Sequence, residues 1–382
     1  MTTSAAVAQI DALLATAVSH DVVTGVAAMA ADRQGITFAT AEGERWSIDT
    51  VTWLGSLAQP IVAVGALQLA ERGVLTMDEP IGDLLPDLAD PQVLEGFDDD
   101  GSPRVRPARG TITLRRLLSH TAGNSYHFWN ADIRRYQEVV GLPGIGECRE
   151  DTLRTPLVFD PGRGWEYGMN IDWVGKAIET ATGTDLDTYL TDHLLGPLGM
   201  RDTGFVLTAQ RRARLAGVSF RTLDGLVPVE FEVNQEPEFQ PGGDGMYGTP
   251  ADYVTFTRML LGNGELNGVR VLGADTMAEA MRNQIGDFSV GALISADPLT
   301  SFDVEFLPGL KKKWGLLGLL NMAETSAGRS PGSVFWAGMA NCYFWVDRDR
   351  GDTGVFFTQV LPFADPEVLA LFDRFETAVH RR

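Results

Sequence analysis

The stretch WLGSLAQPIVAVGALQLAERG, residues 53–73, decides how the rest of this chain is organised. Within residues 57–70 only Gln59 and Gln68 are polar, and a helix that is apolar nearly all round lies in the middle of a protein. Ser56 stands where the helix is expected to begin, because serine is a good N-cap residue. Ser56 and Gln59 are three residues apart, so a helix places them on one face. The sequence therefore predicts a central buried helix with two polar side chains together at its start.

The bulk composition bounds the class of protein. The chain has 382 residues, of which 44% are hydrophobic and 21% charged, as in ordinary globular proteins. This length suits one large domain or two closely packed ones. The net charge of −20 disfavours binding to phosphate backbones and to anionic membrane surfaces. We therefore expect a small-molecule substrate, with no nucleic acid and no membrane as partner; the oligomeric state cannot be read from the sequence.

The chain start and the cysteines indicate the compartment. The first 21 residues lack a basic segment, and Asp11 interrupts their apolar stretch, which predicts an amphipathic helix rather than a signal peptide. No segment has the roughly 18 uninterrupted apolar residues of a membrane span. Cys148 and Cys342 are interpreted as free thiols. Together these features predict a cytoplasmic protein.

Periodicity and turn residues give a coarse order of elements. A helix is expected over residues 5–19, followed by a hairpin over 25–43 with its turn near 32–35. The polar, Gly- and Pro-rich stretch 97–110 is interpreted as a surface loop, and the run KKK at 311–313 as a solvated segment before a strand. Thr113 and Thr249 are expected to cap helices.

The C-terminal part changes character. Residues 332–349 and 352–362 are rich in aromatic and β-branched side chains and are expected to form antiparallel strands. Residues 365–382 have the pattern of an amphipathic helix. Strands at both chain ends with helices between them predict a sheet assembled from the two termini around an inserted helical region.

Seven stretches, taken in order, resemble one family. They are WLGSLAQP, ITLRRLLSHTAG, PGRGWEYGMNIDWVGKAIETATG, GPLGMRDTGF, GGDGMYGTPADY, FWAGMANCYFWVD and TQVLP. They resemble the serine β-lactamase family, with its penicillin-binding-protein-like fold, and especially the class C-like, family VIII carboxylesterase branch, over roughly residues 25–378. The resemblance implies an α/β domain, with an antiparallel sheet flanked by helices, and an inserted all-helical domain. The sheet domain is expected to be discontinuous, over 1–78 and 208–382, with the helical domain over 79–207 and the active site in the cleft between them.

The resemblance also assigns roles at the site. Ser56 matches the nucleophile of the S-x-x-K motif, and Gln59 occupies the position of its lysine. Tyr167 matches the tyrosine that shares proton transfer with that lysine. The backbone N–H groups of Ser56 and Met339 are expected to form the oxyanion hole. Expected substrate-binding residues are Tyr126, His127, Trp129, Asn170, Trp336 and Gly338. No cofactor is expected, and no metal, because the run of three aspartates at 98–100 has no histidine or regular ligand spacing.

Gln59 changes what this site is able to do. A carboxamide is neutral and takes no proton from Ser56, although it still forms hydrogen bonds to Ser56 and Tyr167. Loss of a general base typically costs ~100-fold to ~10,000-fold in rate. His127 is a candidate replacement base because its unperturbed pKa is near neutrality, and the competing interpretation is a histidine that only lines the cleft. Alternatively, Gln59 is an engineered replacement of a natural lysine, which the sequence does not distinguish from a natural glutamine.

Two functions from different classes follow. The first is a serine hydrolase or acyltransferase of the carboxylesterase type, which acts on a small ester, thioester or amide through an acyl group on Ser56. The alternative is a scaffold that has lost covalent catalysis through Gln59, and that binds a small molecule or promotes a non-hydrolytic biosynthetic step. Trp336 in place of the lysine of K-T-G removes a cation that favours substrate carboxylates, so esters are preferred to β-lactams.

Overall fold

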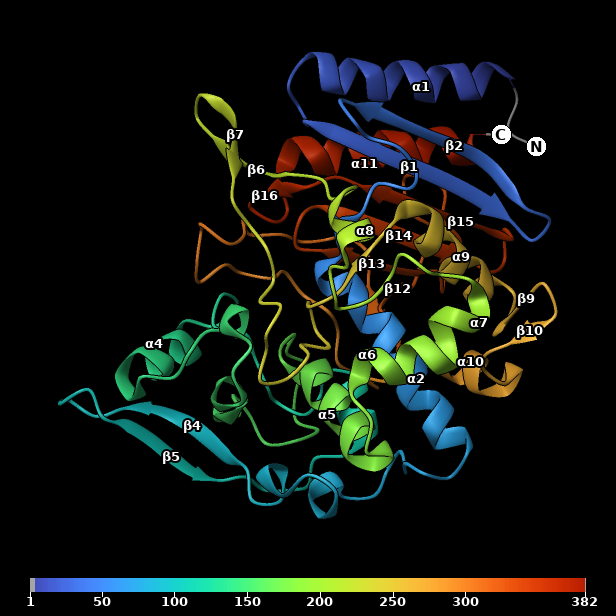
Figure 1. Ribbon diagram of the computed structural model, residues 1–382. Helices are drawn as coiled ribbons and strands as arrows, with labels where there is room; N and C mark the ends of the chain where they lie inside the picture. Colours follow the sequence, from blue (N-terminus) through green and yellow to red (C-terminus); the bar gives the residue numbers. More distant parts are fainter. Residues whose placement is uncertain (1–3, 382) are drawn as a thin grey trace.

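The computed structural model describes residues 4–381, and a seven-stranded antiparallel sheet is its main layer (Figure 1). Across the sheet the strands are β11 Lys312–Trp314, β12 Leu319–Asn321, β13 Val334–Gly338, β14 Cys342–Asp347, β15 Asp352–Phe357, β1 Gly25–Asp32 and β2 Ile36–Gly43. The N-terminal hairpin is joined to the C-terminal strands through β1 and β15, where Met29 lies opposite Val355. The prediction of a sheet built from both chain ends is confirmed.

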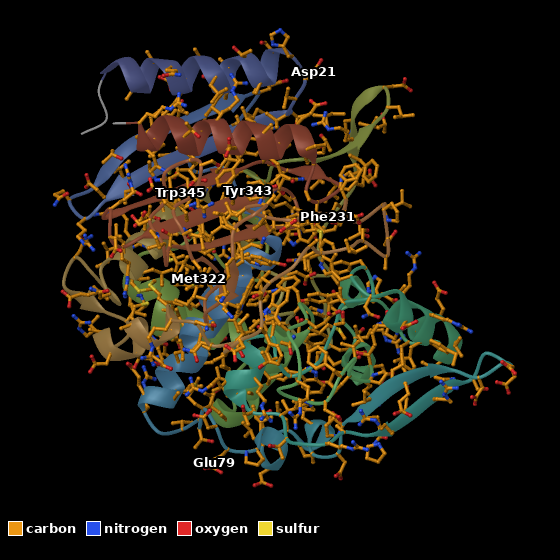
Figure 2. All side chains as sticks on the ribbon, turned by 180° about the vertical axis from the view of Figure 1, so that it is seen from behind. Asp21, Glu79, Phe231, Met322, Tyr343 and Trp345 are labelled. Atoms are coloured by element: carbon orange, nitrogen blue, oxygen red, sulfur yellow. The ribbon has the colours of Figure 1, made fainter. Side chains whose placement is uncertain are left out.

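Helices cover both faces of this sheet. On one face lie α1 Ser4–Ser19 and α11 Pro366–His380, and on the other α2 Ala58–Glu71 and α9 Pro250–Leu261 (Figure 1). Successive side chains of a strand point to opposite faces, and β14 uses both. Tyr343, labelled in Figure 2, stacks on Phe372 of α11, with 4.7 Å between ring centroids. Phe344 packs on Tyr253 of α9. This two-sided burial explains the continuous aromatic run of the sequence.

The segment between the two parts of the sheet is mostly helix and loop. Its helices are α3 Leu114–Leu118, α4 Ala131–Val140, α5 Asn170–Thr182, α6 Leu186–Leu190, α7 Gly196–Leu198 and α8 Ala209–Arg212, with short helical turns at 81–83, 86–88, 145–147, 150–154 and 191–195. The remaining elements are β3 Thr52–Trp53, β6 Val218–Thr222, β7 Gly225–Val229, β8 Tyr247–Gly248, β9 Glu265–Leu266, β10 Val269–Arg270, α10 Ala274–Ala280 and β16 Val360–Leu361. The Thr113 and Thr249 hydroxyls accept hydrogen bonds from the amides of Arg116 and Asp252, so both predicted caps are confirmed.

Two expectations about local structure are wrong. Residues 97–110 are not a loop: β4 Gln92–Phe97 and β5 Pro103–Pro107 form a hairpin that projects away from the sheet (Figure 1). Gly101, with φ +87°, provides the left-handed turn conformation that this hairpin needs. The lysine run is not solvated either, since Lys312 and Lys313 are each 3% exposed. Their ammonium groups remain paired, with Glu305 at 2.7 Å and with the carbonyl oxygen of Gly286 at 2.6 Å.

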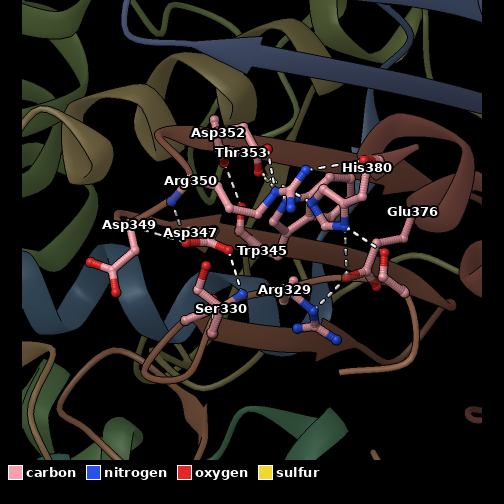
Figure 3. A network of polar contacts seen from close by, with 12 residues as sticks. Arg329, Ser330, Trp345, Asp347, Asp349, Arg350, Asp352, Thr353, Glu376 and His380 are labelled. Carbon is pink, nitrogen blue, oxygen red and sulfur yellow. Dashed lines mark hydrogen bonds and ion pairs between the residues drawn. The ribbon is translucent and has the colours of Figure 1, made fainter. Parts of the chain in front are cut away.

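A buried polar network attaches the end of α11 to the sheet (Figure 3). The Arg329 guanidinium pairs with the Glu376 carboxylate at 2.5 Å, and both side chains are 2% exposed. His380 Nε2 lies 3.3 Å from Asp352 Oδ1, which also accepts a hydrogen bond from Trp345 Nε1. The network therefore joins the last turn of α11 to β14, β15 and the connection before β13.

Within residues 4–381, every helix is too short or too polar to cross a membrane. Cys148 and Cys342 are free and buried. The cytoplasmic location stays a prediction.

Candidate active site

Ser56 lies in a 3-10 turn, Gly55–Leu57, that leads into α2. The prediction that Ser56 caps the helix is wrong, because the N-cap residue of α2 is Leu57 and no side chain caps it. The extra turn moves Ser56 outside the α-helix, so its hydroxyl does not serve the helix amides. Ser56 is 8% exposed, and its side chain lies close to the Tyr167 hydroxyl. The turn thus presents the hydroxyl to the site rather than to the helix.

The turn at Ser56 packs backbone to backbone against the end of β13. A Cβ atom on Gly55, which has φ +53°, would lie 2.6 Å from the Met339 amide nitrogen. A Cβ atom on Gly338 would lie 2.1 Å from the carbonyl oxygen of Leu54. Only glycine allows such an approach at both positions. The two backbone segments assigned to the oxyanion hole are therefore neighbours, and that assignment stays a prediction.

Gln59 holds the Tyr167 hydroxyl from one side. Its Nε2 atom donates to Tyr167 Oη at 2.7 Å and to the carbonyl oxygen of Gly243 at 3.2 Å. A carbonyl oxygen only accepts, so the carboxamide must turn its nitrogen toward Gly243. The Gln59 Oε1 atom is buried and has no hydrogen-bond partner among the described residues. Gln59 thus uses both of its donor hydrogens and leaves its acceptor unused.

Tyr167 is held by a second donor, with a consequence for its proton. Trp336 Nε1 donates to Tyr167 Oη at 3.1 Å, in addition to the hydrogen bond from Gln59. A phenol oxygen has two lone pairs, and both are occupied by N–H groups that cannot accept. The phenol proton is therefore the group that remains to face Ser56. In this arrangement Tyr167 donates a proton toward Ser56 and does not act as its base.

The electrostatic environment of Tyr167 also favours its protonated form. Burial raises the pKa of Tyr167 well above its ordinary value of 10. The interactions that lower this pKa come from the neutral side chains of Ser56, Trp336 and Gln59, and the Asp244 carboxylate raises it further. A phenolate is therefore scarce at neutral pH.

A small cavity of about 10 Å³ lies beside the Ser56 side chain. Its lining residues are Ser56, Trp129, Tyr167, Leu293, Trp336, Ala337, Met339 and Phe363. Trp314 supports this wall from β11, with its ring centroid 4.4 Å from that of Trp336. The space fits about one water-sized group. A larger acyl group needs the side chains around it to move.

A second cavity of about 230 Å³ adjoins the first at Met339. Its lining residues are Trp53, His127, Phe128, Ile145, Gly146, Cys148, Phe231, Glu232, Val233, Asp244, Thr300 and Met339. Phe231, labelled in Figure 2, is 36% exposed. Met339 belongs to both linings, so the two cavities lie against the same residue.

The structure separates the six predicted substrate-binding residues. Trp129 and Trp336 line the Ser56 cavity, and His127 lines the larger cavity instead. Gly338 acts through its close approach to the Ser56 turn, described above. Tyr126 is buried, and its hydroxyl donates to Asp172 Oδ2 at 3.0 Å.

Asn170 lines neither of these two cavities. Its Nδ2 atom lies 3.0 Å from His120 Nδ1, and its Oδ1 atom accepts from Asn124 at 3.2 Å. Burial lowers the pKa of His120 to about 3, so this imidazole is neutral. Asn170 and His120 thus hold the loop that precedes α5.

Two carboxyl groups near Gln59 were not predicted, those of the buried Asp172 and the half-buried Asp244. Asp172 accepts hydrogen bonds from the Gly243 amide at 2.9 Å and from Tyr126, while the Gly243 carbonyl accepts from Gln59. Burial raises the pKa of both Asp172 and Asp244. Repulsion between the two negative charges raises the pKa of Asp244 further. An aspartate inside the apolar run NIDWVG and another within GGDG were the available signals.

Comparisons with known proteins decide the family. The sequence model of the family described as Beta-lactamase matches residues 10–378. The chain belongs to the β-lactamase family. Monacolin J acid methylbutanoyltransferase of Aspergillus terreus is 34% identical over 345 residues, which cover 87% of this chain and 82% of that protein. Lovastatin esterase of Penicillium rubens is 29% identical over 97% of this chain and 98% of its own length.

Solved structures agree with this assignment. A mutant of simvastatin synthase from Aspergillus terreus superposes with a TM-score of 0.85 at 30% identity, covering 99% of this chain and 95% of that one. EstCE1, a hydrolase with promiscuous acyltransferase activity, has a TM-score of 0.78 at 20% identity, over 98% of this chain and 99% of that one, which supports the fold alone. The predicted fold of this β-lactamase family member is confirmed, as is its prediction as an enzyme of the esterase or acyltransferase type.

Proposed function

We propose that this protein transfers an acyl group from a small-molecule ester or thioester to water or to an alcohol, through an ester formed on Ser56. The observation that carries the proposal is the arrangement of Ser56, Tyr167 and Met339 around one cavity. In the first step of the proposed reaction Ser56 Oγ bonds to the acyl carbon, the bond to the leaving group breaks, and the serine proton leaves with that group. In the second step the oxygen of the water or alcohol bonds to the acyl carbon, the bond to Ser56 Oγ breaks, and the proton of the acceptor returns to Ser56. The two neighbouring amides of the expected oxyanion hole stabilise the negative oxygen of the intermediate.

Relatives of this chain support the same reaction class. Two of them are named for acyl transfer and for ester cleavage. Both reactions pass an acyl group from one oxygen or sulfur atom to another, and they differ only in the acceptor. We propose the same reaction class for this chain, but not the substrates of the relatives.

The neutral Gln59 narrows the acyl donor. A serine that keeps its proton is a weak nucleophile, so the acyl carbon must be reactive and its leaving group good. Thiols have a pKa of about 8.5, so the bond to sulfur breaks without prior protonation of the sulfur, and the thiolate then takes up the proton that Ser56 loses. Alkyl alcohols are poorer leaving groups. We therefore propose thioesters and aryl esters as the donor class, ahead of alkyl esters and amides.

One observation favours a second candidate, a scaffold that binds a small molecule without forming an ester. Both lone pairs of Tyr167 Oη are occupied by Gln59 and Trp336, and the carboxamide at residue 59 carries no charge and leaves its Oε1 atom without a hydrogen-bond partner among the described residues. A site in this condition retains its cavities even where covalent chemistry is lost. The larger cavity would then be the working part of the molecule.

Intact-mass measurement separates the two candidates. The protein is incubated with a butyryl thioester of N-acetylcysteamine and, separately, with p-nitrophenyl butyrate. The proposed function predicts the added mass of one butyryl group, which appears faster with the thioester and is absent from Ser56→Ala. No adduct from either donor, on a folded protein, would overturn the proposal and leave the binding scaffold.

A further inference from the structure

We infer that the larger cavity binds an apolar alcohol that carries a basic amine, with the Asp244 carboxylate as the partner of its ammonium group. This inference rests on the proposed function, because the alcohol would be the acceptor, or the leaving group, of the Ser56 ester. It assigns a substrate class that the family relationship does not supply.

The walls of the cavity favour an apolar body. Trp53, Phe128, Phe231, Ile145 and Met339 supply most of its large side chains. The Trp53 indole is fixed, since its Nε1 atom donates to the carbonyl oxygen of Asp244 at 2.6 Å, and its ring packs 4.2 Å from that of Phe231. Ligand sites are typically apolar clefts with a few placed polar groups that set orientation. This cavity matches that description.

Asp244 is a polar residue of this cavity whose carboxylate has no partner among the described residues. Within residues 4–381 no hydrogen-bond donor and no cation is paired with its carboxylate, whereas the neighbouring Asp172 receives two donors. Repulsion from Asp172 adds to the cost of a charge at Asp244. An ammonium group from a ligand would supply the missing donor and the missing positive charge together.

Glu232 is the other carboxylate of the cavity lining, and it differs in its pairing. It forms an ion pair with Arg212, so its charge is already compensated. The described lining residues include no lysine or arginine. A carboxylate-bearing ligand would therefore meet two acidic side chains and no cation of the lining. The cavity should therefore bind an amine more tightly than a neutral compound of the same shape, and the neutral compound more tightly than an acid.

Binding is tested first, without catalysis, in the Ser56→Ala protein. Isothermal titration compares three alcohols of similar shape, namely para-(dimethylaminomethyl)benzyl alcohol, para-isopropylbenzyl alcohol and para-(hydroxymethyl)benzoate. The tertiary amine cannot be acylated to an amide, so the hydroxyl is the acceptor that this compound offers in the later transfer assay. A hydrogen-bonded charge pair predicts that the amine binds about tenfold to a hundredfold tighter than the isopropyl compound, and the benzoate weakest. Equal affinity of the amine and isopropyl compounds would overturn the inference.

Two matched variants identify the carboxylate. Asp244→Asn, in the Ser56→Ala background, should remove the preference for the amine and leave the affinity for the isopropyl compound unchanged. Glu232→Gln removes a carboxylate of the same cavity that is already paired, and should leave the preference intact. Loss of the preference in Glu232→Gln but not in Asp244→Asn would overturn the assignment. Asparagine relieves the repulsion with Asp172, so the first variant is expected to fold, and circular dichroism checks this.

Acyl transfer is then measured with Ser56 restored. The butyryl thioester serves as donor, and the ratio of butyrylated alcohol to free butyrate is compared for the same three alcohols. Transfer to the amine-bearing alcohol above the isopropyl compound supports both proposals. Selective amine binding without any transfer would contradict the proposed function and leave the binding inference standing, so the two failures are distinguishable.

Discussion

The exchange Gln59→Lys tests the central idea about this site. The Nε2 atom of Gln59 lies 2.7 Å from Tyr167 Oη and 3.2 Å from the Gly243 carbonyl oxygen. An ammonium group at that place keeps both acceptors and has a third hydrogen to offer Ser56. A unit charge about 4 Å from a phenolate stabilises it by about 4 kcal/mol at an effective dielectric constant near 20. This corresponds to a fall of about three units in the Tyr167 pKa.

Desolvation of the ammonium group opposes part of that gain. The carboxylates of Asp172 and Asp244, near Gly243, partly neutralise the new positive charge. That charge in turn lowers the pKa of both carboxyl groups. The net expectation is a rise of at least ~100-fold in ester hydrolysis, the lower end of the typical effect of a general base. The assay measures kcat/KM for p-nitrophenyl butyrate as a function of pH. Because the lysine lowers the Tyr167 pKa, we expect kcat/KM of the variant to rise with pH at a lower pH than that of the parent protein.

Two controls make this result interpretable. Gln59→Met has a similar length and no donors or charge, so it should not raise the rate. Ser56→Ala in the lysine background should abolish the gained activity. An unchanged rate in a folded lysine variant would refute the reasoning that the absent base limits the site. A gain that survives loss of Ser56 would refute it as well.

Three further results are expected. His127→Ala should keep the rate of butyryl adduct formation within about twofold, because His127 lines the larger cavity and not the space beside the serine; loss of most of the rate would make it the base. Burial and Asp172 raise the folded-state pKa of Asp244 above its ordinary 3.8, so the folded chain holds this proton more tightly and the stability that Asp244 contributes is lost as pH rises through its folded pKa. Asp244→Asn should therefore raise the melting temperature more at about pH 9 than at about pH 5, and an equal gain at both would contradict the shift. Arg329→Met should lower the free energy of unfolding in urea by about 3–5 kcal/mol, because it leaves the Glu376 carboxylate buried without its cation, and Arg329→Met/Glu376→Leu should recover most of that loss.

The sequence supported the fold better than the site because the two depend on different signals. The continuous aromatic run around Tyr343 and the apolar helix after Ser56 indicate buried layers, and the structure has those layers. The hairpin ending at Pro107 was missed because its strands are short and charged, so turn residues outweighed a weak alternation.

Local composition also misjudged residues whose environment is set by distant parts of the chain. Lys313 is buried because carbonyl groups near Gly286 receive its ammonium group, and nothing within the lysine run indicates this. Asp244 follows a glycine pair that reads as a loop, and its importance depends on Asp172, 72 positions earlier. Such pairings are visible only once the chain is folded.

The junction between β1 and β15 has a consequence for how the protein is made. The nascent hairpin emerges early, but its partner strand is synthesised more than 300 residues later, and at typical elongation rates the wait is tens of seconds. During that time β1, whose first seven residues are buried in the finished sheet, lacks the strand that covers its edge. Contacts of such long sequence separation also slow folding. Co-expression of chaperones is therefore expected to raise the yield of soluble protein, because they cover that edge until β15 is made.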